Sequence, residues 1–243
     1  MIQLRLSYCF FFLIGLISLS SLSQTTDKFG TSGTYSWTVP SGVNSVEVEA
    51  IGGGGNGGNT SKTGGNTTKV AGGGGGGAYV KSTISVNPGT TYTVFVGGSG
   101  ADSYFINQST LLAKGGKSVA ENTVAGGQGG SPTNSIGTTK FSGGNGADGS
   151  GTSSGGGGGS SAGNSADGND GLNNSGGTAP SGGGDGGDGA TNGNGKTQND
   201  GSPGQNPGGG GGGSLVSGGG GLNATGRSGG DGQIKISYSS STQ

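Results

Sequence analysis

Apolar and polar residues alternate in short segments of the first half of the chain. In Val43–Ile51, Val46 and Val48 fall on one face of an extended chain and Glu47 and Glu49 on the other. A period of two is typical of a strand with one buried face. The same alternation predicts further strands at Tyr35–Val39, Ala78–Val86 and Thr91–Val96, and two short strands within Ser103–Gly116. We therefore predict an all-β fold, a small antiparallel sheet or sandwich.

A turn signal separates two of these strands. The segment "NPGT" at 87–90 places Pro88 and Gly89 in its two central positions. Proline followed by glycine at these positions is the signature of a type II turn. We therefore expect Ala78–Val86 and Thr91–Val96 to form a tight antiparallel hairpin.

The second half of the chain is dominated by glycine. The chain has 68 glycines among 243 residues and only 25% hydrophobic residues, which is too few for one large core. Residues 115–231 consist almost entirely of Gly, Ser, Asn, Thr, Asp and Ala, a composition typical of flexible linkers. Alternation returns in 232–238, "GQIKISY", close to the C-terminus. A lone terminal strand needs a sheet to pair with, so we expect the glycine-rich tract to be a closed insertion.

The glycines also show a period of three. Examples are Gly143, Gly146 and Gly149, then Gly183, Gly186 and Gly189, then Gly226, Gly229 and Gly232. Three residues per turn is the period of polyproline II, and glycine alone fits where such helices pack side by side. Glycine-rich sequence also produces such runs by chance. Two interpretations stay open: packed polyglycine-II helices, or a mobile loop.

The first 23 residues have the plan of a secretory signal peptide. Arg5 precedes the apolar run "YCFFFLIGLISLS", and small residues follow up to a predicted cleavage after Ser23. The run is shorter than the roughly 20 residues of a membrane-spanning helix, although a retained anchor is the alternative. We therefore expect a secreted or cell-surface protein. The predicted divisions are a signal peptide at 1–23, a polar lead at 24–32, a β-rich region at 33–114, a glycine-rich region at 115–231, a closing strand at 232–238 and a tail at 239–243.

Composition excludes several functions. Eleven Lys and Arg balance twelve Asp and Glu, and no basic cluster is present to neutralise the phosphates of nucleic acid. The chain has no histidine, and its one cysteine, Cys9, lies in the signal segment. Ser-His-Asp catalysis, Cys-His catalysis and the usual zinc sites therefore lack their residues. We expect neither an enzyme nor a cofactor.

Calcium is the alternative ligand. The segments "GGNGADGSG" and "GGDGGDGAT" match the start of the nonapeptide of calcium-binding β-rolls. Asp148 and Asp188 would be ligands, with Asp185 nearby, because carboxylates suit this hard cation. However, small residues occupy the apolar position of the nonapeptide in both segments, and the two copies are not in tandem.

The chain contains, in order, "WTVPSGVNSVEVEAIGGGG", "GGGGGGAYVKSTISVNPGTTYTVFVGGSG" and "GGDGQIKISY". Together they resemble the glycine-rich domain of bacteriophage tail-tip adhesins and of bacterial exported proteins, over about 29–238. The resemblance implies a small β part carrying stacked polyglycine-II helices whose connecting loops bind surface receptors. The signal segment favours the exported branch over the phage branch.

We therefore expect a structural or adhesion protein that binds a cell-surface glycan, polymer or protein receptor through its glycine-rich loops, without a membrane span in the mature chain. The candidate loops are Asn164–Asn174 and Thr191–Pro207. The candidate binding residues are Asn164, Asp167, Asn169, Asp170, Asn192, Asn194 and Asn199. The alternatives are a calcium-binding exported module and a low-complexity matrix filler with no specific ligand.

Overall fold

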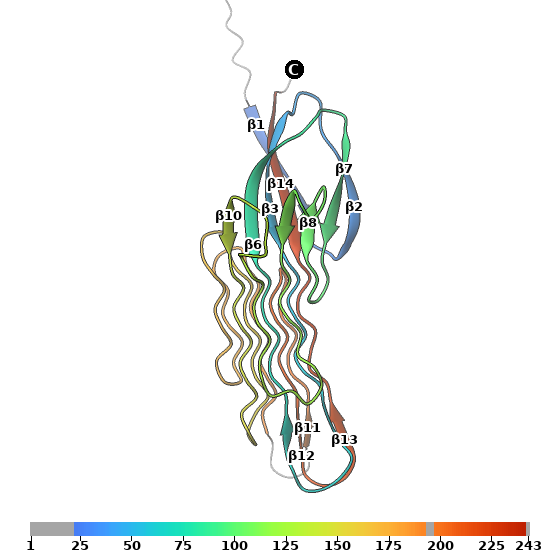
Figure 1. The fold of residues 1–243 in the computed structure, drawn as a ribbon, viewed down its shortest axis with the longest axis vertical. Helices are drawn as coiled ribbons and strands as arrows, with labels where there is room; N and C mark the ends of the chain where they lie inside the picture. The colour runs from blue at the N-terminus through green and yellow to red at the C-terminus, as the bar shows by residue number, and fades with distance from the viewer. Residues whose placement is uncertain (1–21, 193–196, 242–243) are drawn as a thin grey trace, which may run out of the picture.

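A computed structural model describes residues 22–192 and 197–241 (Figure 1). Within these residues the protein is all-β, with fourteen strands and no helix, as predicted. Figure 1 shows an elongated molecule with a β-sandwich at one end, a bundle of extended segments in the middle and short strands at the far end. The described part contains no helix that is long and apolar enough to cross a membrane.

The first sheet of the sandwich joins the two ends of the chain. Its order is β1 (Leu22–Phe29), β14 (Gln233–Ser241), β3 (Ser45–Ile51), β6 (Tyr79–Ser85) and β10 (Thr139–Phe141), and every pair is antiparallel. Strand β14 lies between β1 and β3. The prediction that the terminal strand closes the sheet is therefore confirmed, and the glycine-rich sequence is held between strands of one domain.

Strand β1 was not predicted. Its residues fall mainly in the segment assigned as a polar lead, 24–32, and it forms the edge of the sheet, where few apolar residues are needed. The predicted signal peptide lies outside the described residues except for Leu22 and Ser23, which begin β1.

The second sheet has the order β2 (Gly33–Thr38), β7 (Thr91–Val96), β8 (Ser103–Phe105) and β9 (Leu111–Ala113). Strands β8 and β9 pair as the two short strands predicted within 103–116.

The predicted hairpin around "NPGT" is wrong, although its turn forms. The Thr90 N–H donates to the Asn87 carbonyl at 3.1 Å, and Gly89 has a φ of 77°, as a type II turn requires. The strands on either side belong to different sheets, since β6 pairs with β3 and β10 and β7 pairs with β2 and β8. The turn therefore connects the two layers of a sandwich.

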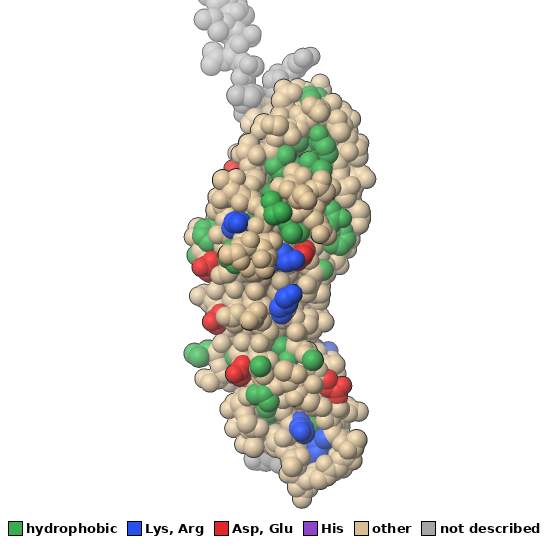
Figure 2. Space-filling model, in the orientation of Figure 1, with side chains coloured by type: hydrophobic (Ala, Val, Ile, Leu, Met, Phe, Trp, Pro, Cys, Tyr) green, Lys and Arg blue, Asp and Glu red, His purple; other side chains and the backbone are tan. Residues whose placement is uncertain are grey.

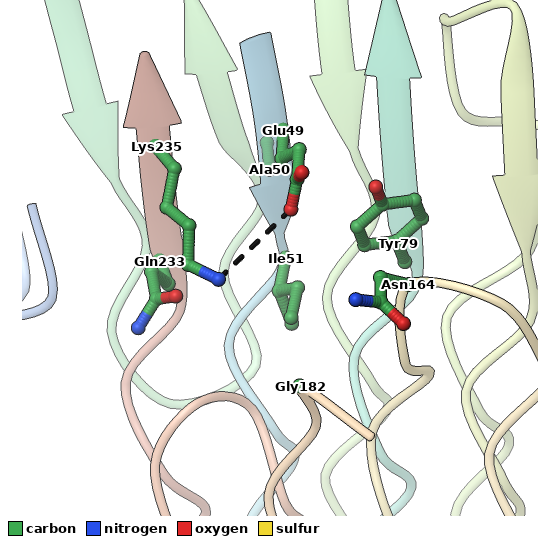
Figure 3. Close-up of a pocket in the computed structure, with 8 residues that line it drawn as sticks. All are labelled: Glu49, Ala50, Ile51, Tyr79, Asn164, Gly182, Gln233 and Lys235. Carbon is green, nitrogen blue, oxygen red and sulfur yellow. Dashed lines mark ion pairs between the residues drawn. The ribbon is translucent and has the colours of Figure 1, made fainter. Parts of the chain in front are cut away.

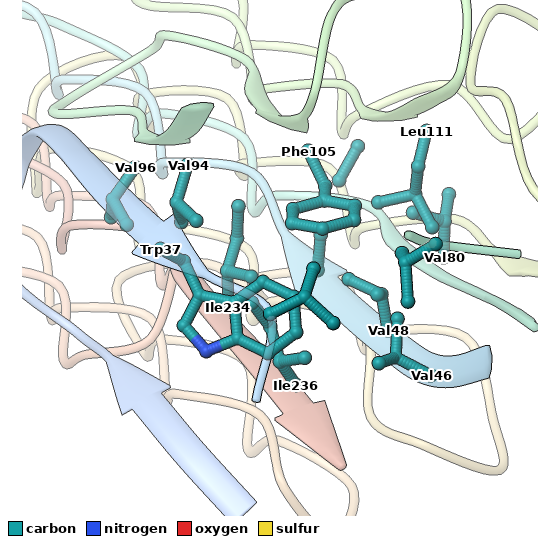
Figure 4. Packing of buried hydrophobic residues seen from close by; sticks show 14 of the residues in the cluster. Trp37, Val46, Val48, Val80, Val94, Val96, Phe105, Leu111, Ile234 and Ile236 are labelled. Atoms are coloured by element: carbon teal, nitrogen blue, oxygen red, sulfur yellow. The ribbon is translucent and has the colours of Figure 1, made fainter. Parts of the chain in front are cut away.

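Apolar side chains fill the space between the two sheets (Figure 4). Phe105 is fully buried, with its ring 6.0 Å from that of Trp37. The Trp37 Nε1–H donates to Asp27 Oδ2 at 2.8 Å, so the indole keeps a hydrogen bond at the edge of the core. The alternating residues Val46 and Val48 of β3 point into this core, as predicted.

Below the sandwich the chain runs back and forth in extended glycine-rich segments (Figure 1). Every third N–H of segment 52–58 donates to the same antiparallel neighbour: Gly52 to Ala78, Gly55 to Gly75 and Gly58 to Gly72, at 2.8 to 3.0 Å. The backbone thus repeats its contacts with a period of three.

Segment 52–58 also forms backbone hydrogen bonds with two further segments. Gly54 and Gly57 donate to the carbonyls of Gly230 and Arg227, both at 2.9 Å. A third neighbour donates to it, with the Gly116 N–H bound to the Gly53 carbonyl at 2.9 Å. One segment is therefore hydrogen-bonded on three sides, unlike a β-strand, which has two neighbours at most. We call the glycine-rich segments joined in this way the glycine bundle.

Close backbone approach explains the glycines of the bundle. A Cβ atom at Gly76 would lie 1.9 Å from the Ser160 carbonyl oxygen, and one at Gly211 would lie 1.9 Å from the Arg227 carbonyl oxygen. No side chain fits at such distances. These contacts favour a packed arrangement over the mobile loop, and the bundle also includes glycines from Gly52 onward.

Short strands close the far end of the bundle. They form a sheet of order β11 (Thr197–Asn199), β12 (Leu215–Ser217) and β5 (Lys69–Val70), and a pair of β13 (Leu222–Ala224) with β4 (Thr60–Lys62). Two small apolar clusters lie here, one around Leu215 and one around Val216. These strands have two or three residues each, too few to show a period in the sequence.

Candidate functional site

Acidic side chains on the bundle bind the backbone of neighbouring segments. Asp185 Oδ1 accepts from the Ala179 N–H at 2.6 Å, and Asp188 Oδ1 accepts from the Gly176 N–H at 2.8 Å. The two acceptors are three residues apart and hold one antiparallel neighbour. Each side-chain oxygen thus takes the place of a backbone carbonyl in the three-residue pattern.

The same arrangement recurs in three further pairs of Asn or Asp at a spacing of three. Asn56 and Asn59 accept from the N–H groups of Gly229 and Gly226, Asn145 and Asp148 from Gly129 and Gly126, and Asp167 and Asp170 from Ser142 and Asn145, at 2.6 to 3.2 Å. We call these side chains the Asx acceptors. They supply hydrogen bonds where the neighbour's N–H has no facing carbonyl.

This pattern changes the interpretation of several candidate residues. Each of the three aspartates considered as calcium ligands, Asp148, Asp185 and Asp188, has one oxygen bound to backbone. Across residues 22–192 and 197–241, no three His, Cys, Asp or Glu side chains gather as a metal site requires. Among the candidate binding residues, Asp167 and Asp170 hold neighbouring segments in the same way.

Asn169 also has a structural contact, because its Nδ2–H donates to the Thr178 carbonyl at 2.6 Å. The remaining candidates separate to opposite ends of the bundle. Asn164 lies beside the sandwich, near Tyr79 (Figure 3). Asn192 and Asn199 lie together at the far end, and Asn194 falls outside the described residues.

The far end carries a wide polar groove of about 770 Å3. Its walls come from the end of segment 184–192, from β11 with Asp200 after it, and from β13 with Thr225 after it. The lining residues are Gly189, Ala190, Thr191, Asn192, Gln198, Asn199, Asp200, Asn223 and Thr225, and we call this site the distal groove. Asn192 and Asn199 were predicted as binding residues, and Gln198 lies in the predicted loop Thr191–Pro207, but Asn223 was not predicted.

Hydrogen bonds hold the walls of the distal groove in place. The Asn192 Nδ2–H donates to the Thr152 carbonyl at 3.2 Å, and Asn192 Oδ1 accepts from Thr197 Oγ1 at 3.2 Å. Asp200 accepts from the Thr225 N–H at 2.7 Å and pairs with Arg227 at 3.0 Å. Arg227 thus neutralises the charge of Asp200, which is the one carboxylate among the lining residues.

Gln198 and Asn223 are exposed and line the groove from two different strands. An amide both donates and accepts hydrogen bonds, so these groups suit uncharged hydroxyl-bearing or amide-bearing ligands. Figure 2 shows acidic and basic side chains scattered over one face of the molecule, without a patch of one sign. The lining of the distal groove is therefore polar and nearly neutral in charge.

Comparison with known proteins gives one family. A comparison with curated proteins gave no match. The model of the glycine-rich domain matches residues 30–239, which include the second sheet, the first sheet apart from β1 and the end of β14, the bundle and the distal groove. Since this match covers most of the sequence, the chain belongs to the glycine-rich domain family.

Proposed function

We propose that the protein is an exported adhesion or structural protein of the cell surface, and that it binds a surface polymer or receptor through the distal groove. The observation that carries this proposal is the position of a wide, polar, hydrogen-bonded groove at the end of an elongated molecule. The signal-like segment at 1–23 and the resemblance to tail-tip adhesins support export and adhesion. The proposal assigns no enzymatic activity.

We infer that the glycine bundle consists of polyglycine-II helices. The three-residue period and the three hydrogen-bonded neighbours of segment 52–58 support this inference, since three residues per turn direct successive N–H groups to three sides. A bundle whose segments are hydrogen-bonded in this way to several neighbours is a stiff spacer. It holds the distal groove away from the sandwich, and β1, which begins with the last two residues of the signal-like segment, lies at the opposite end.

The ligand class follows from the lining of the groove. Residues with amide and hydroxyl side chains line the groove, while the carboxylate of Asp200 is paired with Arg227. Hydroxyl-rich glycans match such groups better than nucleic acid or a strongly charged polymer does. A cell-surface glycan is therefore the proposed ligand, with a protein receptor as the second possibility.

A binding assay tests this function. Residues 24–243 are incubated with a glycan array and with a panel of insoluble polysaccharides, beside the double variant Gln198→Ala/Asn223→Ala. We expect saturable binding to at least one glycan and at least tenfold weaker binding by the variant, because both exposed amides line the groove.

Asn134→Ala is the matched control, since Asn134 is an exposed amide in the loop before β10, outside the groove. Equal binding by the double variant contradicts the assignment to the groove. Absence of saturable binding to every probe favours the matrix filler.

A further inference from the structure

A buried hydroxyl group lacks a partner at the junction of the sandwich and the bundle. Tyr79, at the start of β6, is only 1% exposed, and its ring packs against Phe141 with centroids 6.1 Å apart. Within the described part of the chain, its Oη has no partner at normal hydrogen-bond distance, and the acceptor that it faces is the Glu49 carboxylate. A buried polar group left unpaired costs stability, so such a group calls for an explanation.

Tyr79 lines a small pocket, which we call the Tyr79 pocket (Figure 3). The pocket is formed by Glu49, Ala50, Ile51, Tyr79, Asn164, Gly182, Gln233 and Lys235. Its volume is about 10 Å3, close to what one water molecule or one hydroxyl group needs. The sandwich supplies the floor, and two turns of the bundle supply the exposed residues Asn164 and Gly182 at its rim.

The charges of the pocket nearly cancel. Glu49 Oε2 lies 4.0 Å from Lys235 Nζ, too far for a hydrogen bond, so both groups retain capacity for a further partner. The neighbouring carboxylate of Glu47 is bound to Lys81 at 2.9 Å. A bound cation would meet the Lys235 ammonium and a bound anion would meet the Glu49 carboxylate. A neutral polar group is therefore the best match.

The Tyr79 hydroxyl acts in this pocket as a neutral donor. Burial, followed by the carboxylates of Glu49 and Glu47, raises the pKa of Tyr79 well above its ordinary value. The hydroxyl therefore keeps its proton at neutral pH. An alcohol that enters the pocket could accept this hydrogen bond and donate its own proton to Glu49.

We propose that the Tyr79 pocket binds a carbohydrate by taking one of its hydroxyl groups between Tyr79 and Glu49. The sugar ring then lies at the rim, against the amide of Asn164 and the backbone of Gly182, while Lys235 donates to the same or an adjacent sugar oxygen. This site is separate from the distal groove and does not rest on the function proposed for that groove.

A titration tests the proposal with D-glucose, D-galactose, N-acetyl-D-glucosamine and glycerol as probes. Amide resonances of 15N-labelled residues 24–243 are followed in the wild type and in Tyr79→Phe, which removes the hydroxyl and keeps the ring. We expect at least one sugar to shift the amides of Asn164, Gly182 and Gln233 saturably. The Tyr79→Phe variant should bind that sugar about tenfold more weakly.

Thermal unfolding without sugar supplies a second measurement. Because the hydroxyl is unpaired, Tyr79→Phe should be at least as stable as the wild type. Tyr104→Phe is the matched control, since Tyr104 stacks on Phe95 on the other sheet, with centroids 4.9 Å apart, and should change neither sugar binding nor the pocket resonances.

Three results would overturn the proposal: no probe shifts the pocket amides, or Tyr79→Phe binds as well as the wild type, or Tyr79→Phe is clearly destabilised because an ordered water pairs the hydroxyl. The double variant Gln198→Ala/Asn223→Ala separates the two sites. It should leave this titration unchanged even where it abolishes binding to polysaccharide.

Discussion

The sandwich and the glycine bundle are stabilised by opposite means. In the sandwich, side chains such as Phe105 and Val48 fill the space between two sheets, and the hydrophobic effect supplies the free energy. In the bundle, glycines bring backbones together until N–H groups meet carbonyls on three sides. The comparison shows that a sequence with few apolar residues still forms a packed body when its backbone takes the place of side chains.

The two regions should therefore respond oppositely to substitution. Removal of atoms leaves a cavity in the sandwich, whereas addition of one carbon forces segments of the bundle apart. The following predictions test this contrast.

The largest effect is expected from Phe105→Ala in the sandwich. Phe105 is fully buried and packs against Trp37 and Tyr92, with ring centroids 6.0 Å apart in both cases. Loss of the ring should lower the free energy of unfolding by about 4 kcal/mol. Urea denaturation of purified 24–243 measures it, and a loss below about 1 kcal/mol would contradict a side-chain core.

The next effect is expected from Gly76→Ala in the bundle. The added Cβ would lie 1.9 Å from the Ser160 carbonyl oxygen. We expect a loss of about 3 kcal/mol, at the upper end of the range for overpacking. Gly64→Ala is the control, because its added Cβ meets no atom within 4 Å. Equal stability of the two variants in urea would show that the bundle is not closely packed.

Alkaline pH should weaken the sandwich through Tyr79. Its pKa is raised in the folded state by burial and by nearby carboxylates. Above about pH 10 the unfolded tyrosine ionises while the folded one stays protonated, so stability falls as pH rises, by about 1.4 kcal/mol per pH unit. Denaturation midpoints at pH 9 to 11 measure this slope. Tyr79→Phe should make the slope smaller. An unchanged slope in this variant would refute the assignment of the pH dependence to Tyr79.

A smaller effect is expected from Asp185→Ala, which removes an Asx acceptor. The Ala179 N–H would lose its partner, at a cost of about 1 kcal/mol. Asp185→Asn keeps an oxygen at this position and should lie close to the wild type. Thermal unfolding of both variants, with and without calcium, distinguishes a hydrogen-bond acceptor for the backbone from a calcium ligand. Loss of a calcium-dependent shift in both variants would instead support a metal ligand.

Much of the sandwich could be predicted from the sequence, because its strands show a period of two. Strand β7 has the predicted bounds, and β14 closes the sheet as expected. The pairing of β6 with β7 was predicted wrongly, since the turn at 87–90 fixes a change of direction but not the sheet that the next strand joins.

The neighbours within the bundle could not be predicted, because glycine marks a close backbone contact without showing which segment makes it. The Asx acceptors did leave a mark, since Asp167 and Asp170, like Asp185 and Asp188, are spaced by three. From the sequence, Asp167 and Asp170 were predicted as binding residues, and Asp185 and Asp188 as ligands in the calcium alternative. In the structure their spacing repeats the period of the backbone contacts instead.

Amide hydrogen exchange on calcium-free residues 24–243 tests the central claim most directly. The N–H groups of Gly74, Gly75 and Gly76 each donate to a different neighbour, at 2.8 to 3.0 Å. The account predicts that these three amides are protected to nearly the same degree as those of β3. Exchange at the rate of an unfolded chain in the bundle, with protection confined to the sandwich strands, would contradict it.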